Sequence, residues 1–275
     1  MVSQEQRRRQ LAREKFLRQQ QRRTSARRKA RMRNSVIASV LGVVVIGSVA
    51  LYTTGVLKND DDKASNAGSD VTPSASPSPS KAPDPCEKPA KGSVQKLSWK
   101  KEPAMSIDQS AKYTMKLATT CGDIGVALKT SAAPHTVNSF DFLANKGYFD
   151  HTKCHRLTTN GIYVLQCGDP TGSGSGGPGY TIPDENLKDK SLKGNVYPAG
   201  TVAMANTGQK HTGGSQFFLV YQDSQLPPSY TPFGTVDAAG MKVLKKIAAA
   251  GESTGQGDGA PNATVVINKA TVTKS

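Results

Sequence analysis

The sequence lacks the motifs of several common classes of functional site. It has no Cys-x-x-Cys pair, and no second pair of ligands follows the His–Cys cluster His151–His155 at zinc-finger spacing. We therefore expect no metal site. A Gly-x-Ser-x-Gly nucleophile elbow is also missing, which leaves a serine hydrolase with little support.

Two glycine-rich stretches lack the context of a nucleotide-binding loop. The segment Gly172–Gly177, "GSGSGG", matches Gly-x-Gly-x-x-Gly, but Pro178 and Pro183 follow it and leave no helix N-terminus for a pyrophosphate. The segment 212–216, "TGGSQ", lacks the lysine of a phosphate-binding loop. The sequence therefore predicts no nucleotide, and no other cofactor is expected.

Acidic residues are scarce near the N-terminus. The whole chain of 275 residues has 36 Lys and Arg residues against 21 Asp and Glu, a formal net charge of +15. Residues 1–34 hold 13 basic and two acidic residues, so they carry 13 − 2 = +11 and the other 241 residues carry 15 − 11 = +4. Such a basic tail can meet RNA, anionic lipid or no particular partner.

Charged residues are then absent from Val36–Leu57, a run of 22 residues that is long enough to span a bilayer as a helix. Its basic flank predicts a cytoplasmic tail over 1–34 and a signal-anchor over 35–57, with residues 36–57 in the lipid bilayer. A cleaved signal peptide is the alternative, because Ser48–Ala50 has the small residues of a cleavage site. A buried helix of a soluble domain is disfavoured, since the run shows no polar face.

Large apolar side chains are rare in Lys58–Pro85, which is rich in Ser, Pro, Asp and Ala. Such a segment buries too little apolar surface to fold. We therefore expect a linker over 58–110, made of a disordered tether and a pre-domain extension.

All four cysteines follow the membrane segment: Cys86, Cys121, Cys154 and Cys167. Their even number suits an oxidising compartment and two disulfides. Four cysteines allow three pairings, which the spacing alone does not distinguish.

Residues 111–275 show the patterns of a folded domain. Tyr113–Leu128 has the pattern of a hairpin, and a helix is expected to begin near Pro134 and end before Gly147. A second helix fits Asp237–Gly251, with Asp237 as its cap. Further short strands are expected at 154–157, 163–167, 201–205, 216–221, 233–236 and 263–274. Many short strands with two helices predict a mainly β fold, a closed antiparallel barrel.

The segment Met204–Gln222, "MANTGQKHTGGSQFFLVYQ", makes a resemblance specific. Together with "CHRL", "VLQCGDP", "GGPGY" and "PFGTV", it resembles the cyclophilin-type peptidyl-prolyl cis-trans isomerases over roughly Tyr113–Lys274. The resemblance implies a closed eight-stranded barrel capped by two helices. With its basic tail and single membrane segment, the chain is similar to membrane-anchored forms of high-GC Gram-positive bacteria.

The resemblance also implies the site residues. Arg156 falls on the position of the main catalytic side chain, and Gln166 on that of its partner. Both interrupt apolar runs, as expected if they lie side by side on adjacent strands and face a pocket. The alternative is an arginine neutralised by a nearby carboxylate, with Gln166 bonded to the backbone. The substrate-binding positions of the family fall on Tyr163, Val164, Ala205, Asn206, Gln216, Phe218, Leu226 and Tyr230.

The sequence departs from the commonest family pattern in four places. The loop "TTNGI" after Arg156 is two residues longer, and Val164 replaces the usual methionine. Gln225 stands where many members have Trp, and Tyr230 where they have His. Neither position supplies the central hydrogen-bond donor, so the resemblance still implies activity, whereas binding of the cyclic peptide inhibitor of the family is in doubt.

The same resemblance favours one pairing of the cysteines. Cys154 precedes Arg156 by two residues and Cys167 follows Gln166 by one, so adjacent strands would bring the two cysteines together. A disulfide requires Cα atoms within about 7 Å. Cys86 and Cys121 then remain, and their bond would tie the end of the tether to the first hairpin.

The implied function is isomerisation of Xaa-Pro bonds in extracytoplasmic proteins, with Arg156 assisting the twist of the amide and no covalent intermediate. A proline-peptide-binding module or holdase with little turnover is the alternative. The expected partners are proline-containing polypeptides, and no nucleic acid is expected because the basic charge stops at the membrane segment. The expected location is the cell membrane, with a single pass, a cytoplasmic N-terminus and an extracytoplasmic catalytic domain.

Overall fold

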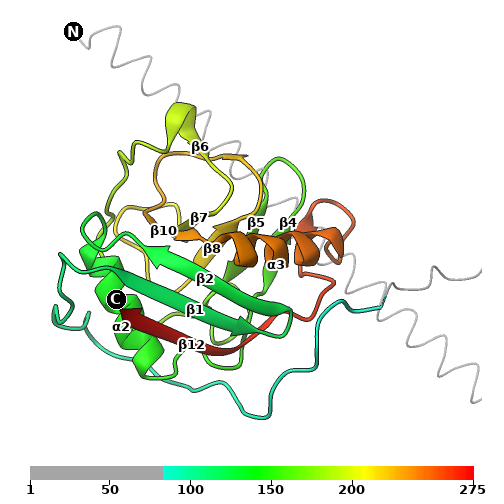
Figure 1. The fold of residues 1–275 in the computed structure, drawn as a ribbon, viewed down its shortest axis with the longest axis horizontal. Helices are drawn as coiled ribbons and strands as arrows, with labels where there is room; N and C mark the ends of the chain where they lie inside the picture. The colour runs from blue at the N-terminus through cyan, green and yellow to red at the C-terminus, as the bar shows by residue number, and fades with distance from the viewer. Residues whose placement is uncertain (1–82) are drawn as a thin grey trace, which may run out of the picture. The chain divides into compact units, whose positions relative to one another are not determined.

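The structure is a computed structural model that describes residues 83–275 (Figure 1). The expected basic tail, the membrane anchor and most of the tether lie outside these residues. Among the helices of residues 83–275, none combines the length and the apolar character needed to cross a membrane.

The domain is built on one large antiparallel sheet. Ten strands follow one another in the order β11-β4-β5-β8-β7-β10-β2-β1-β12-β3, and β6 pairs with β9 in a separate two-stranded sheet. The strands are β1 (Tyr113–Thr119), β2 (Gly122–Leu128), β3 (Thr152–Lys153), β4 (Arg156–Thr158), β5 (Val164–Cys167), β6 (Val196–Tyr197), β7 (Thr201–Met204), β8 (Phe217–Val220), β9 (Ser224–Gln225), β10 (Pro232–Val236), β11 (Asp258–Gly259) and β12 (Val266–Lys274).

The structure differs from the predicted closed eight-stranded barrel, because its main sheet has ten strands and remains open. The mainly β character and the antiparallel pairing are confirmed, but within residues 83–275 the sheet curls without a pairing between its outermost strands, β11 and β3. Each of these strands has only two residues. Strands this short present too few backbone groups to continue the ladder around the sheet.

The expected hairpin is present as β1 and β2. Met115 and Leu117 are buried in β1, and the residues between and before them are exposed, as expected for a strand with one face on the core. The register pairs Tyr113 with Leu128 and Thr119 with Gly122, so the strands remain matched along their whole length.

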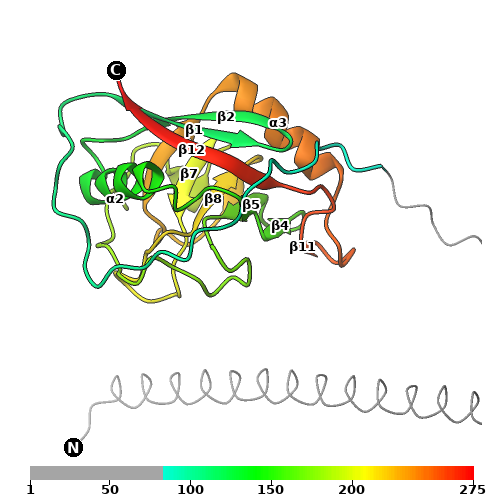
Figure 2. The same cartoon turned by 90° about the horizontal axis from the view of Figure 1, so that it is seen from below.

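Both expected helices are confirmed, α2 (Pro134–Asn145) and α3 (Ala238–Ala249). Pro134 occupies the first turn of α2, where a missing N–H costs nothing. The Asp237 carboxylate accepts a hydrogen bond from the Gly240 N–H at 2.6 Å and caps α3. Figure 2 shows the two helices on opposite sides of β1, β2 and β12.

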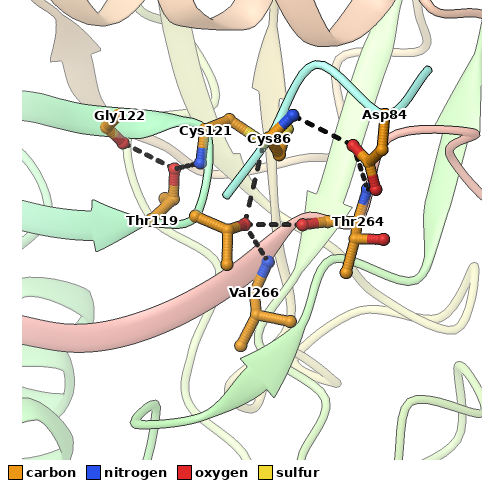
Figure 3. Close-up of a disulfide and its surroundings, with 8 residues drawn as sticks. Asp84, Cys86, Thr119, Cys121, Gly122, Thr264 and Val266 are labelled. Carbon is orange, nitrogen blue, oxygen red and sulfur yellow. Dashed lines mark hydrogen bonds between the residues drawn. A yellow bond between two sulfur atoms is a disulfide. The ribbon is translucent and has the colours of Figure 1, made fainter. Parts of the chain in front are cut away.

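The segment 83–112 contains no helix or strand, yet it lies along the outside of the domain and passes α2 (Figure 2). Cys86 forms a disulfide with Cys121 at the β1–β2 turn (Figure 3). The Asp84 carboxylate accepts hydrogen bonds from the N–H groups of Cys86 and Thr264, each at 3.0 Å. The start of the segment is therefore fixed to both β1–β2 and the approach to β12. We name residues 83–112 the N-terminal strap.

Candidate active site

Arg156 and Gln166 lie opposite each other on β4 and β5. Their neighbours Leu157 and Leu165 also form a pair and are buried in the main core. Because side chains alternate along a strand, Arg156 and Gln166 point to the other face of the sheet. The Cys154–Cys167 disulfide joins the ends of the same two segments and is the pair that the resemblance favoured.

A row of hydrogen bonds extends from this pair. The Arg156 Nη1 donates to Gln166 Oε1 at 3.2 Å, and the Gln166 Nε2 donates to Gln216 Oε1 at 2.9 Å. The Gln216 Nε2 in turn donates to the Gly176 carbonyl at 2.9 Å. Each amide is thus fixed by a partner on both sides, so the orientation of both side chains is set before any peptide binds.

Asp258, on β11, holds the other side of the guanidinium. Its carboxylate accepts from Arg156 Nε at 2.7 Å and from Nη2 at 2.8 Å, which is bidentate pairing. Hydrogen bonding to Asp258 raises the pKa of Arg156, and the reciprocal bond lowers the pKa of Asp258. Both groups are therefore charged at neutral pH. Asp258 was not predicted from the sequence, because it lies in a glycine-rich stretch without a strand pattern.

The alternative, an arginine neutralised by a carboxylate with Gln166 bonded to the backbone, agrees with the structure only in its first part. Arg156 does pair with a carboxylate, but Gln166 bonds to side chains and not to the backbone. A guanidinium has five N–H donors, and the three bonds to Asp258 and Gln166 leave 5 − 3 = 2 of them, one on each Nη atom. The Arg156 side chain remains 38% exposed, so a ligand can reach it.

An apolar cluster lies beside the polar row and is separate from the main core. Gln166 pairs with Phe218 across β5 and β8, and Val164 pairs with Val220, which places apolar and polar groups on one face. The buried members are Val164, Tyr197, Ala203, Phe218, Val220 and Leu226, with Ile162, Leu192, Ala205 and Tyr230 packed against them.

Tyr197 is a buried member of this cluster. It was not among the site residues predicted from the sequence. It is fully buried, and its hydroxyl donates to the Tyr230 carbonyl at 2.9 Å and accepts from the Tyr230 N–H at 3.2 Å. Burial raises the pKa of Tyr197, so the hydroxyl stays protonated. The Phe218 ring meets the Tyr230 ring edge-on at 5.4 Å. Tyr197 could not be predicted from the sequence, because β6 has only two residues and shows no alternation of apolar and polar side chains.

Two predicted substrate-binding residues stand apart from the cluster. The Tyr163 ring packs against the main core and lies 5.9 Å from the Tyr221 ring, on the other side of β5. Asn206 lies at the rim, where its Nδ2 donates to the Ser229 carbonyl at 2.7 Å and joins two loops. The other substrate-binding positions fall in the apolar cluster or, in the case of Gln216, in the polar row.

The glycine-rich loop after β5 uses its N–H groups internally. The buried Asp169 carboxylate accepts from the N–H groups of Thr171 at 2.7 Å and Gly174 at 2.6 Å. Burial acts to raise the pKa of Asp169, but these hydrogen bonds outweigh it and the pKa is lowered. The backbone N–H groups of this loop thus surround the Asp169 carboxylate. This role explains a glycine-rich loop at this position.

No group of three or more His, Cys, Asp or Glu side chains in residues 83–275 is arranged to hold a metal ion. In the cluster 151–155, the Cys154 sulfur belongs to a disulfide.

Comparison with known proteins places this arrangement in a family. The model of the family "Cyclophilin type peptidyl-prolyl cis-trans isomerase/CLD" matches residues 114–272, more than half of the chain. The chain belongs to the cyclophilin family. All the residues of the polar row and the apolar cluster lie within the match, and so does Asp258, whereas the strap precedes it.

Cyclophilin relatives occur in mycobacteria. The chain is 46% identical over 199 residues to the "Probable peptidyl-prolyl cis-trans isomerase B" of Mycobacterium leprae, which covers 70% of this chain and 63% of the relative. A protein of the same name from Mycobacterium tuberculosis is 44% identical, with 70% and 60% covered. The match therefore spans about three fifths of the length of these relatives.

A solved cyclophilin has the same fold. The crystal structure of a cyclophilin-type peptidyl-prolyl cis-trans isomerase from Cryptosporidium parvum is 26% identical and has a TM-score of 0.50. It covers 60% of this chain, and 99% of its own length is matched. The similarity thus extends over essentially one whole cyclophilin domain.

Proposed function

We propose that this chain is a peptidyl-prolyl cis-trans isomerase in which Arg156 is the catalytic side chain. The observation that carries the proposal is the pairing of Arg156 with Gln166 on one face of the sheet, beside an apolar cluster on Val164 and Phe218. A charged donor next to an apolar surface suits a substrate with an amide nitrogen and a hydrophobic ring.

The chemistry requires no covalent step. Resonance gives the Xaa-Pro bond a rotation barrier of about 18–20 kcal/mol, so uncatalysed exchange takes tens of seconds or longer. In the twisted transition state the prolyl nitrogen regains a lone pair. A guanidinium N–H can donate to that lone pair, and this hydrogen bond does not exist in the planar ground state.

The ion pair with Asp258 determines which N–H groups of Arg156 remain available to the substrate. Asp258 occupies Nε and one N–H of Nη2, so the guanidinium plane is fixed and a remaining Nη proton faces the substrate. The apolar cluster holds the prolyl ring, and Gln166 and Gln216 bind the peptide backbone. A fall in half-time from ~100 s to ~1 ms corresponds to about 7 kcal/mol, which these contacts share.

The clients are proline-containing segments of secreted or membrane proteins, and residues 36–57 anchor the enzyme in the cell membrane. Two features support this location. The four cysteines of the domain form two disulfides, which persist in oxidising compartments. A tail of net charge +11 precedes a charge-free run long enough for one span.

Turnover by the full chain tests this proposal. The cis-trans exchange rate of a short Xaa-Pro peptide, measured by NMR exchange spectroscopy, should rise in proportion to the chain concentration. A chain that binds the peptide and prevents aggregation of an unfolded client, but leaves the exchange rate unchanged, would be a holdase and would overturn the proposal.

A further inference from the structure

An open cavity of about 1060 Å³ adjoins the polar row. Gln166 and Gln216 line it and also belong to the row, so the cavity and the proposed catalytic site share a wall. The glycine-rich loop forms a second wall with Gly174–Gly177. The N-terminal strap forms a third with Lys100, Lys101 and Glu102, although the strap lies outside the family match.

The strap is firmly held where it lines the cavity. The Trp99 N–H donates to the Pro178 carbonyl at 2.8 Å, and its ring meets the Phe142 ring edge-on at 5.0 Å. Gly179, with φ +89°, lets the strap approach, since a Cβ there would lie 2.6 Å from the Trp99 carbonyl oxygen. Lys100 and Lys101 therefore follow an anchored residue and stay at the cavity.

The strap remains anchored beyond the lysines. The side chain of the buried Asn138 in α2 donates to the carbonyls of Pro103 at 3.2 Å and Ala104 at 3.1 Å, and it accepts from the Ser106 N–H at 2.9 Å. Both flanks of the lysine pair are thus bonded to the domain.

The charges at the cavity do not cancel. Glu102 bonds to His135 Nδ1 at 2.6 Å and its side chain is 25% exposed. Lys100 and Lys101 are exposed, and neither forms an ion pair with a carboxylate of residues 83–275. No other Asp or Glu of the described part of the chain lines the cavity. Of the described residues that line the cavity, two are cations and one is a carboxylate, so the wall has a net charge of 2 − 1 = +1.

We propose that this cavity is a specificity subsite for a carboxylate side chain, Asp or Glu, close to the proline of the substrate, and that Lys100 and Lys101 select it. This proposal rests on the proposed function, because the occupant is a residue of the same peptide. An extended chain advances about 3.3–3.6 Å per residue, so the side chains one to three positions from the proline are those that reach a cavity next to Gln166.

Matched six-residue peptides test the subsite with the full chain. Each carries Glu, Gln or Lys at one of the three positions before or after the proline, and kcat/KM is measured by NMR exchange. At one position the Glu peptide should exceed its Gln counterpart about fivefold at low salt, as for two exposed charge pairs, and the Lys peptide should fall below it. The preference should fade near ~0.5 M salt.

Charge reversal assigns the preference to residues. The variant Lys100→Glu/Lys101→Glu should favour the Lys peptide, and Lys100→Ala/Lys101→Ala should no longer favour the Glu peptide over the Gln peptide. The matched control, Lys91→Glu/Lys96→Glu, makes the same charge change at exposed strap residues that do not line the cavity, so it should retain the preference for Glu.

The outcomes separate the two proposals. Equal turnover of Glu and Gln peptides at every position by an active parent chain would overturn the subsite and leave the isomerase intact. A control that loses the preference as fully as the test variant would also overturn it, because the net charge would then be responsible. Absence of turnover with every peptide would instead overturn the proposed function.

Discussion

The guanidinium of Arg156 is held by side chains from both neighbouring strands. Asp258 of β11 and Gln166 of β5 flank Arg156 of β4 and together engage all three nitrogens. A long, flexible side chain thereby becomes a fixed donor. Asp258 acts through Arg156 and not on the substrate, so in our account it is a positioning residue.

Asp258→Asn should reduce turnover without preventing folding. The amide keeps one acceptor, but its NH₂ group faces an arginine donor, so one charge-assisted bond and the ion pair are lost. Because Asp258 is 56% exposed, we expect a loss of only about 1 kcal/mol, or roughly fivefold in kcat/KM. Asp123→Asn, which breaks an exposed ion pair with Lys116, is the matched control and should leave kcat/KM unchanged. Equal values for both variants would remove Asp258 from the mechanism.

The pH dependence of turnover follows from the same pair. The pKa of Arg156 is raised and that of Asp258 is lowered, so both groups are ionised from neutral pH down to below the ordinary aspartate range near 3.9. A carboxylate with a lowered pKa stabilises the fold above its unfolded-state pKa and loses this effect as the pH falls through its folded value. We therefore expect kcat/KM to be level from about pH 6.5 to 9. A catalytic titration inside that range would require a general acid or base that this account does not contain.

At the scale of elements, the β4–β5 unit depends on the disulfide at its ends. Cys154 and Cys167 are separated by 13 residues, and a cross-link closing a loop of this size is worth about 3 kcal/mol in the chain-entropy model. The strands carry Arg156 and Gln166, so loosening them loosens the row of hydrogen bonds as well.

Removing that disulfide should therefore affect stability and turnover together. We expect Cys154→Ser/Cys167→Ser to lower both Tm and kcat/KM. Cys86→Ser/Cys121→Ser removes the other disulfide, away from the polar row, and should lower Tm while leaving turnover of an uncharged peptide within about twofold, since loop closure stabilises mainly through the unfolded state. Titration of the denatured, non-reduced parent should find no free thiol in the domain, and a finding of four would contradict both disulfides.

Elements with local patterns were predictable from sequence, and elements that depend on distant partners were not. The β1–β2 hairpin has its hydrophobic alternation in one stretch, and the cap of α3 lies three residues before the N–H it accepts. By contrast, β11 has two residues and pairs with β4, with Asp258 opposite Thr158, 100 residues earlier in the chain. That long-range pairing brings Asp258 to Arg156, which is why the positioning carboxylate could not be found by pattern.

At the scale of the whole molecule, family motifs predicted more of the site than periodicity did. Periodicity indicated strands, but only the resemblance distinguished Arg156 and Gln166 from surface residues of a sheet. Its assignment of Tyr163 to substrate binding stays a prediction, and in the structure this ring packs against the main core. The strap was expected to be a pre-domain extension, and only the structure reveals that Trp99 fixes it against α2 and that it lines a cavity.

The membrane topology is a prediction from charge alone. The tail of net charge +11 should stay in the cytoplasm, and residues 83–275 should lie outside. Protease added to intact protoplasts should then degrade the cyclophilin domain and spare the tail. Full protection of the domain, with degradation only after lysis, would reverse the orientation.

The central claim is that the Arg156 guanidinium catalyses the rotation. Its most direct test is kcat/KM for an Xaa-Pro peptide, measured on the full chain and on Arg156→Ala, with circular dichroism to establish folding. We predict a loss of at least tenfold in the folded variant, which is at least about 1.4 kcal/mol of transition-state stabilisation, and little recovery in Arg156→Lys, because a point charge lacks the planar geometry. Near-parental turnover by folded Arg156→Ala would contradict the account.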